Sequence, residues 1–280
     1  AILTVAIWGL TFIATKVLII HGLTPQEIFF YRFLIAYIGI WAISPKHLFA
    51  DNLKDELWLV AGGVFGGSLY FFTENTALGI TQASNVAFII CTAPLLTTIL
   101  SLLFYKSEKA TKGLIYGSLL ALIGVGLVVF NGSVVLKLSP VGDLLTLLAA
   151  LSWAFYSLVI KRMTGRYPTV FITRKIFFYG VLTILPAFLL HPLQPDFDVL
   201  LQPLVLSNLL FLAVLASLIC YILWNVVLKQ LGTMRASNYI YLNPLVTMVA
   251  SVLILHEQIT WITLMGAACI ILGVYLAEKK

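Results

Sequence analysis

The sequence predicts an all-α membrane protein with ten transmembrane helices, arranged as two inverted five-helix repeats around a central cavity. Three observations predict this fold: an apolar composition, ten apolar segments, and a set of motifs that occurs twice. Of the 280 residues, 61% are apolar and 10% are charged, whereas soluble domains are about 45–50% apolar and about 25% charged. This composition excludes a soluble enzyme, a nucleic-acid-binding protein and a disulfide-held secreted domain.

The apolar segments are separated by Pro, Asn, Asp or clusters of Lys and Arg. A helix needs about 20 predominantly apolar residues to cross a bilayer. We expect transmembrane helices at about 2–20, 27–43, 57–78, 83–104, 112–130, 141–161, 170–190, 206–229, 236–255 and 259–277. The chain does not begin with Met, so we also expect a short stretch before Ala1.

The basic residues predict the orientation of the spans, because cytoplasmic loops of membrane proteins carry an excess of Lys and Arg. With both termini cytoplasmic, 14 of the 17 basic residues lie in or beside cytoplasmic segments: Lys46, Lys54, Lys106, Lys109, Lys112, Lys161, Arg162, Arg166, Arg174, Lys175, Lys229, Arg235, Lys279 and Lys280. Lys137 lies outside, and Lys16 and Arg32 lie within spans. We therefore expect a multi-pass inner (plasma) membrane protein with both termini cytoplasmic.

The second half of the chain repeats motifs of the first half at offsets of about 145 to 153 residues. The repeated pairs are Trp8 with Trp153, Lys16 with Lys161, 78–85 with 231–238, Pro94 with Pro244, Glu108 with Glu257, Gly117 with Gly266 and Gly124 with Gly273. We expect a first repeat at 1–136 and a second at 141–280. Five spans per repeat force the two copies into opposite orientations, as in many secondary transporters.

This order of motifs resembles the EamA domain of the drug/metabolite transporter superfamily. The shared features are an early Trp, an Ala-Leu-Gly followed by Ala-Ser-Asn, a Pro-Leu in the next span, a later Glu and a closing Gly-x6-Gly-Val. The resemblance covers both halves. It implies a ten-span bundle with a cavity lined mainly by spans 1, 3, 4, 6, 8 and 9, and export of amino acids, other metabolites or drugs.

Polar and aromatic side chains recur at helical spacing in these same six spans, which is typical of a helix that faces a cavity. The candidate substrate-binding residues from these stripes are Trp8, Thr11, Tyr70, Asn85, Trp153, Tyr156, Tyr221, Trp224, Asn225, Asn238 and Tyr241. Two alternatives remain open. Small polar residues also allow close helix packing, and Trp and Tyr also form belts at membrane interfaces.

Of the charged residues within spans, three matter most, and all three lie toward the half predicted to face outward: Lys16, Arg32 and Glu74. A lone charge in hydrocarbon costs about 2.5–3.5 kcal/mol on insertion scales, so it usually faces a cavity or a partner. Arg32 or Lys16 is a candidate to hold an anionic substrate group, with Glu74 beside it. The alternatives are snorkelling of Lys16 to the interface, a structural pair between Arg32 and Glu74, and proton transport by Glu74.

Pro94 and Pro244 occupy equivalent positions within spans 4 and 9. Proline removes a backbone hydrogen bond and kinks or breaks a helix, so both residues are candidates for gating elements; static shaping of the cavity is the alternative. The three cysteines lie in apolar segments and fit buried apolar side chains. We expect no metal site, no cofactor and no catalytic residues.

The sequence therefore predicts a secondary transporter, not an enzyme, that exports small organic metabolites by alternating access. Amino acids are the first candidates among these small-molecule substrates. Uptake or efflux of sugars, nucleotide precursors or cationic drugs is the alternative within transport. An intramembrane lipid enzyme and a passive channel are alternatives of another class. The expected partners are the substrate and the lipid bilayer, without nucleic acid, and the protein is expected to be a monomer or a homodimer.

Overall fold

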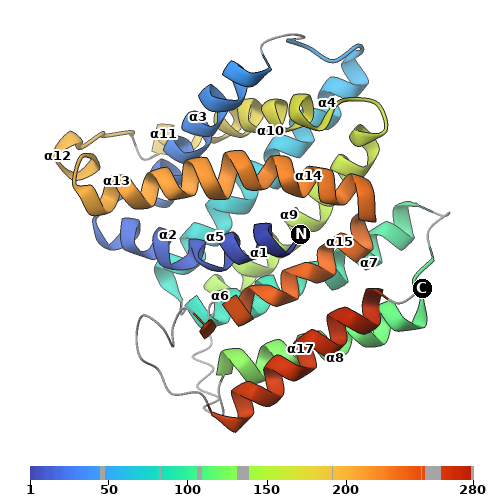
Figure 1. Cartoon of the computed structure of the whole chain (residues 1–280). Coiled ribbons are helices and arrows are strands. Elements are labelled where there is room, and N and C mark those ends of the chain that lie inside the picture. Colours follow the sequence, from blue (N-terminus) through green and yellow to red (C-terminus); the bar gives the residue numbers. More distant parts are fainter. Residues whose placement is uncertain are drawn as a thin grey trace.

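The computed structural model describes residues 1–280 except 45–47, 82, 106–108, 131–138, 191, 247, 250–259 and 279–280. All regular elements in these described residues are helices (Figure 1). Eight are long and apolar enough to cross a membrane: Ile2–Ile20, Pro25–Ile43, Asn85–Phe104, Lys112–Phe130, Pro140–Thr164, Thr169–Leu189, Pro203–Leu231 and Trp261–Glu278. The all-α membrane class is confirmed, and the count of ten spans and the inverted repeat stay predictions.

The first half of the chain forms the elements α1 (Ile2–Gly9), α2 (Thr11–Ile20), α3 (Pro25–Ile43), α4 (Leu53–Gly63), η1 (Val64–Ser68), α5 (Leu69–Ile80), α6 (Ala83–Ile90), α7 (Ala93–Phe104) and α8 (Lys112–Phe130). Local sequence explains their starts. Thr24 and Glu27 form a capping box before α3, with Pro25 in its first turn. The Asn52 side chain accepts a hydrogen bond from the Asp55 amide and caps α4.

The second half forms α9 (Pro140–Thr164), α10 (Thr169–Ile184), α11 (Ala187–Leu190), α12 (Phe197–Leu200), α13 (Pro203–Leu210), η2 (Phe211–Ile219), α14 (Cys220–Leu231), α15 (Thr233–Asn238), η3 (Tyr239–Leu242) and α17 (Trp261–Glu278). Of the repeated motif positions, Glu108 and Glu257 lie outside the described residues. So do residues 137 and 138, which lie between the two predicted repeats.

A helix break precedes each of the two span prolines. Cys91 and Thr92 form a turn between α6 and α7, and Pro94 lies in the first turn of α7, where its missing N–H costs no hydrogen bond. In the second half, the 3-10 turn η3 precedes Pro244. The breaks place irregular backbone beside the centre of the molecule, and the gating role of these prolines stays a prediction.

Two long helices contain π-helical segments, in which the backbone hydrogen bonds span five residues instead of four. The segment η1 joins α4 to α5, and η2 joins α13 to α14. Such wide turns are rare and occur frequently at functional sites. They occupy corresponding positions in the two halves, within predicted spans 3 and 8.

The helices α8 and α17 pack along their length at one edge of the molecule (Figure 1). Their glycines meet pairwise: a Cβ on Gly124 would lie 2.6 Å from the Gly266 carbonyl oxygen, and a Cβ on Gly266 would lie 2.8 Å from the Gly124 carbonyl oxygen. Gly117 and Gly273 meet in the same way. Small residues therefore bring the two backbones together, as is common where membrane helices cross.

Two carboxylates at the start of α4 tie this helix to the second half of the chain. Asp55 is buried and accepts hydrogen bonds from Arg166 Nη1 (2.8 Å) and Tyr167 (3.1 Å). Burial alone would raise its pKa, but the hydrogen bonds from Asn52, Arg166 and Tyr167 outweigh burial and hold the pKa below its usual value.

Glu56 forms an ion pair with the buried Lys175 and accepts a hydrogen bond from Tyr179, both on α10. Burial would raise the pKa of Glu56, but the bonds from Lys175, Tyr179 and the Ala50 amide outweigh it and lower the pKa. The stabilisation is therefore present at neutral pH and is lost as the pH falls through the lowered pKa of the folded state.

We expect Glu56→Gln to lower the unfolding temperature at neutral pH, because it leaves the buried Lys175 without its counter-charge. The difference from wild type should shrink as the pH falls below the ordinary glutamate range. Thermal unfolding of detergent-solubilised protein between neutral and acidic pH measures it. Asp51→Asn is the control, since Asp51 is exposed. A difference that grows at acidic pH would contradict the prediction.

Candidate functional site

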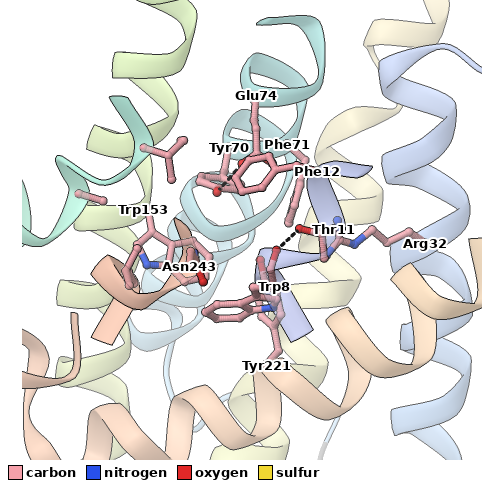
Figure 2. Close-up of a pocket in the computed structure, with 13 residues that line it drawn as sticks. Trp8, Thr11, Phe12, Arg32, Tyr70, Phe71, Glu74, Trp153, Tyr221 and Asn243 are labelled. Atoms are coloured by element: carbon pink, nitrogen blue, oxygen red, sulfur yellow. Dashed lines mark hydrogen bonds between the residues drawn. The ribbon is translucent and has the colours of Figure 1, made fainter. Parts of the chain in front are cut away.

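A small cavity lies within the helix bundle (Figure 2). It is lined by Trp8, Thr11, Phe12, Arg32, Tyr70, Phe71, Glu74, Ile90, Ala93, Trp153, Tyr221, Ile240 and Asn243. These residues come from all six spans that the resemblance implied, and Arg32 adds a seventh, span 2.

One cation and one carboxylate face the same cavity. The Arg32 side chain is 2% exposed; its Nε donates to Ser217 Oγ at 2.6 Å, and its guanidinium lies 4.1 Å from the Phe71 ring centre. Glu74 is 7% exposed and accepts a hydrogen bond from the Tyr70 hydroxyl at 2.7 Å. Arg32 and Glu74 form no ion pair within the described residues. Both charges therefore keep hydrogen-bonding capacity for a ligand.

Aromatic rings form the walls of the cavity. Trp8 packs edge-on against Trp153 at 5.3 Å between ring centres, and Tyr70 packs against Trp153 at 5.2 Å. The Trp8 indole donates to the Ala216 carbonyl at 2.9 Å, and the Tyr221 hydroxyl donates to the Gly66 carbonyl at 2.5 Å. These bonds fix the rings, so the walls are preorganised for an apolar group or for a cation held over a ring face.

A second layer of predicted residues lies beneath this wall. Tyr156 donates to Asn225 Oδ1 at 2.7 Å, and Asn225 Nδ2 donates to Thr173 at 2.8 Å. Trp224 is fully buried and packs on Trp8 at 5.0 Å. Tyr156, Trp224 and Asn225 do not line the cavity; they support the side chains that do.

Four other predicted residues lie away from the cavity. Lys16 donates to the Leu78 carbonyl at 2.8 Å, where it satisfies an unpaired carbonyl near the end of α5. Asn238 accepts a hydrogen bond from Ser118 at 2.7 Å and so joins α15 to α8. Tyr241 is buried against α8 and α17, and Asn85 is buried in α6. None of the four lines the cavity.

Six lining residues were not among the predicted ones: Phe12, Phe71, Ile90, Ala93, Ile240 and Asn243. Phe12 and Phe71 directly follow the predicted Thr11 and Tyr70, so a wider stripe would have included them. Asn243 lies next to Pro244, at the break in its span. Ile90, Ala93 and Ile240 are apolar residues beside helix breaks, and nothing in their side chains distinguishes them from lipid-facing residues.

The lining groups suit reversible binding of a small molecule. They include one guanidinium, one carboxylate, hydroxyls and aromatic faces, with no His or Cys. Within the described residues, no three His, Cys, Asp or Glu side chains gather in a group that could hold a metal ion. The cavity thus offers charged and aromatic recognition in a mostly water-excluded space.

Residues 1–130 and 140–278 match the family model described as the EamA-like transporter family. The chain belongs to the EamA-like transporter family. This EamA-like transporter is 28% identical to an uncharacterized transporter of Archaeoglobus fulgidus, over 99% of this chain and 96% of the relative. It is also 28% identical to a protein of Salmonella typhimurium named probable amino-acid metabolite efflux pump, over 99% of this chain and 92% of the relative. The Escherichia coli protein of the same name is 24% identical, over 99% of this chain and 92% of the relative.

A solved crystal structure has the same fold as this EamA-like transporter, with a TM-score of 0.74 at 18% identity. The likeness covers 98% of this chain and 94% of the other. Family membership and the apolar helices together identify a multi-pass membrane transporter of small molecules. The resemblance inferred from the repeated motifs is confirmed.

Proposed function

We propose that this EamA-like transporter is a secondary transporter that exports small organic metabolites, with amino acids as the first candidates. The observation that carries the proposal is the presence of Arg32 and Glu74 in one cavity without a direct bond between them. A zwitterion offers the carboxylate and the ammonium that complement these two charges. Two relatives named probable amino-acid metabolite efflux pumps support the same substrate class.

In this proposal the substrate carboxylate binds the guanidinium of Arg32, since arginine holds carboxylates through paired charge-assisted hydrogen bonds. The substrate ammonium binds Glu74, and the side chain of the substrate lies among Trp8, Trp153 and Tyr70. Ser217 and Phe71 hold the guanidinium in place. Burial of these charges strengthens their attraction for a ligand, because the local dielectric constant is low.

The membrane arrangement completes the proposal. We place the protein in the inner (plasma) membrane. The distribution of Lys and Arg favours a cytoplasmic position for both termini. The segments 1–136 and 141–280 act as inverted repeats that move against each other. The helix breaks before Pro94 and Pro244 make these prolines our candidates for gating. Glu74 is our candidate for proton coupling, because its carboxylate can accept a proton.

Counterflow in proteoliposomes tests the function. Purified protein loaded with one amino acid should accelerate uptake of the same radiolabelled amino acid, and the rate should saturate. A pH gradient should drive accumulation in wild type and not in Glu74→Gln if Glu74 carries protons. Linear, non-saturating flux without counterflow would establish a channel, and product formation from lipid would establish an enzyme. Exchange of sugars, nucleotide precursors or cationic drugs in place of amino acids would overturn the substrate class.

A further inference from the structure

The segments η1 and η2 are each bonded to the opposite half of the chain. In η1, the Phe65 carbonyl accepts a hydrogen bond from Ser152 Oγ at 2.8 Å and the Gly66 carbonyl accepts one from the Tyr221 hydroxyl at 2.5 Å. In η2, the Ala216 carbonyl accepts from Trp8 Nε1 at 2.9 Å and Ser217 Oγ accepts from Arg32 Nε at 2.6 Å. The bonding is thus reciprocal between the two halves.

These bonds stabilise an otherwise unfavourable backbone. A wide turn interrupts the regular ladder of helix hydrogen bonds, and a buried carbonyl without a partner costs free energy. Side-chain donors that insert at such a turn replace the missing partners. Three donors, Trp8, Ser152 and Tyr221, pair carbonyls of the two segments, and all three are at least nine-tenths buried, so water does not compete for these carbonyls. The fourth donor, Arg32, is equally buried and bonds the Ser217 hydroxyl of η2 instead.

Three of the four donors, Trp8, Arg32 and Tyr221, also line the cavity. Cavity residues follow each segment along the chain as well: Tyr70, Phe71 and Glu74 follow η1, and Tyr221 follows η2. Each residue of an α-helix turns the chain by about 100°. If a π segment tightens by the equivalent of one residue, the helix that follows it therefore rotates by about the same angle. A change between the π and the α form therefore changes the direction in which the cavity side chains point.

We propose that η1 and η2 form a conformational switch coupled to the cavity, in which each segment tightens from its π form to a regular α-helix when its hydrogen bonds to the opposite half break. The proposal rests on the proposed binding of a substrate in the cavity. A ligand that contacts Tyr221 together with Trp8 or Arg32 changes donors of both segments at once. Gly66 packs directly against the Tyr156 ring and Gly67 against Phe33, so a change of winding in η1 also shifts these two contacts.

Ser152 provides the sharpest test, because it bonds η1 and does not line the cavity. Ser152→Ala removes the donor to Phe65. Ser157→Ala is the matched control: Ser157 lies on the same helix, α9, is also fully buried, and donates to Trp153 O of its own helix at 3.0 Å. Tyr221→Phe provides a second test at the same segment, since it removes the donor to Gly66 and keeps the ring.

Hydrogen exchange of ligand-free protein in nanodiscs measures the switch. We expect the amides of 64–70 to exchange roughly threefold to tenfold more slowly in Ser152→Ala and in Tyr221→Phe, because the loss of one net hydrogen bond to the opposite half shifts η1 toward the regular α-helix, which pairs these amides. Faster exchange would show only a loosened segment and would overturn the proposal. Ser157→Ala should match wild type. Equal exchange in Ser152→Ala, Tyr221→Phe and Ser157→Ala would overturn the proposal.

The counterflow rate then tests the coupling to transport. A turnover changed at least threefold in Ser152→Ala, with Ser157→Ala unchanged, supports the coupling, and slower exchange with unchanged turnover overturns it. Because the exchange measurement needs no substrate, it stays informative where the amino-acid panel fails. Absence of counterflow with every amino acid tested therefore counts against the proposed substrates, and unaltered hydrogen exchange counts against the switch.

Discussion

Replacement of Arg32 by alanine should weaken amino-acid binding by about tenfold to hundredfold. Hydrogen bonds to a charged group contribute about 1.5–3 kcal/mol, and each 1.4 kcal/mol corresponds to a factor of ten in affinity. The proposed contact with the substrate carboxylate would be lost completely. The measurement is the concentration that gives half-maximal counterflow, together with quenching of the fluorescence of Trp8 and Trp153 beside the site.

Lys16→Met is the matched control, because Lys16 is the other basic residue that we predicted as a carboxylate ligand. Its Nζ bonds the Leu78 carbonyl and lies outside the cavity, so its removal should leave the affinity unchanged. Arg32→Lys keeps the charge and loses the planar pair of donors, so an intermediate affinity is expected. A loss of affinity in Lys16→Met equal to that in Arg32→Ala would contradict the assignment of Arg32.

Replacement of Gly117 by valine should destabilise the protein by about 3 kcal/mol, the upper part of the range for overpacked sites. A Cβ at this position would overlap the Gly273 carbonyl oxygen and would lie 2.7 Å from the Ala277 amide nitrogen. These are backbone atoms, which cannot rotate away, so α8 and α17 must separate. The measurement is the unfolding temperature in detergent, compared with that of wild type.

Gly79→Val is the control for the intrinsic effect of valine in a helix. Gly79 lies in α5 with no atom within 4 Å of a built Cβ, so its replacement should change the unfolding temperature little. The reciprocal variant Gly273→Val should resemble Gly117→Val, because the two glycines pack against each other. Similar stabilities of Gly117→Val and Gly79→Val would show that the close approach of α8 and α17 contributes little to stability.

The residues of the cavity were partly predictable from helical spacing. Trp8, Thr11, Tyr70, Trp153 and Tyr221 were all expected from polar and aromatic stripes, and all five line the cavity. The stripes could not separate cavity contacts from polar contacts between helices. Asn225 and Asn238 recur at the same spacing, yet they bond Tyr156 and Ser118 instead.

The wide helical turns limit how far a stripe of residues can be extended along a span. A stripe at a period of 3.6 residues assumes a regular helix, and π segments change the period without a characteristic side chain. Ser217 lies within η2 and Tyr221 after it, so the spacing of four residues between them is not that of a regular helix. No pattern in the sequence indicated η1 or η2.

The sequence by itself determined the membrane class, the approximate helix boundaries and the family. These properties depend on composition, on the length of apolar segments and on the order of motifs, all of which are local. The tertiary structure decided which polar groups meet. Arg32 lies in a span outside the predicted cavity set, and it reaches the cavity only because Ser217 of η2 and the ring of Phe71 hold it there. Such contacts join residues far apart in the chain, so helical spacing alone could not have predicted them.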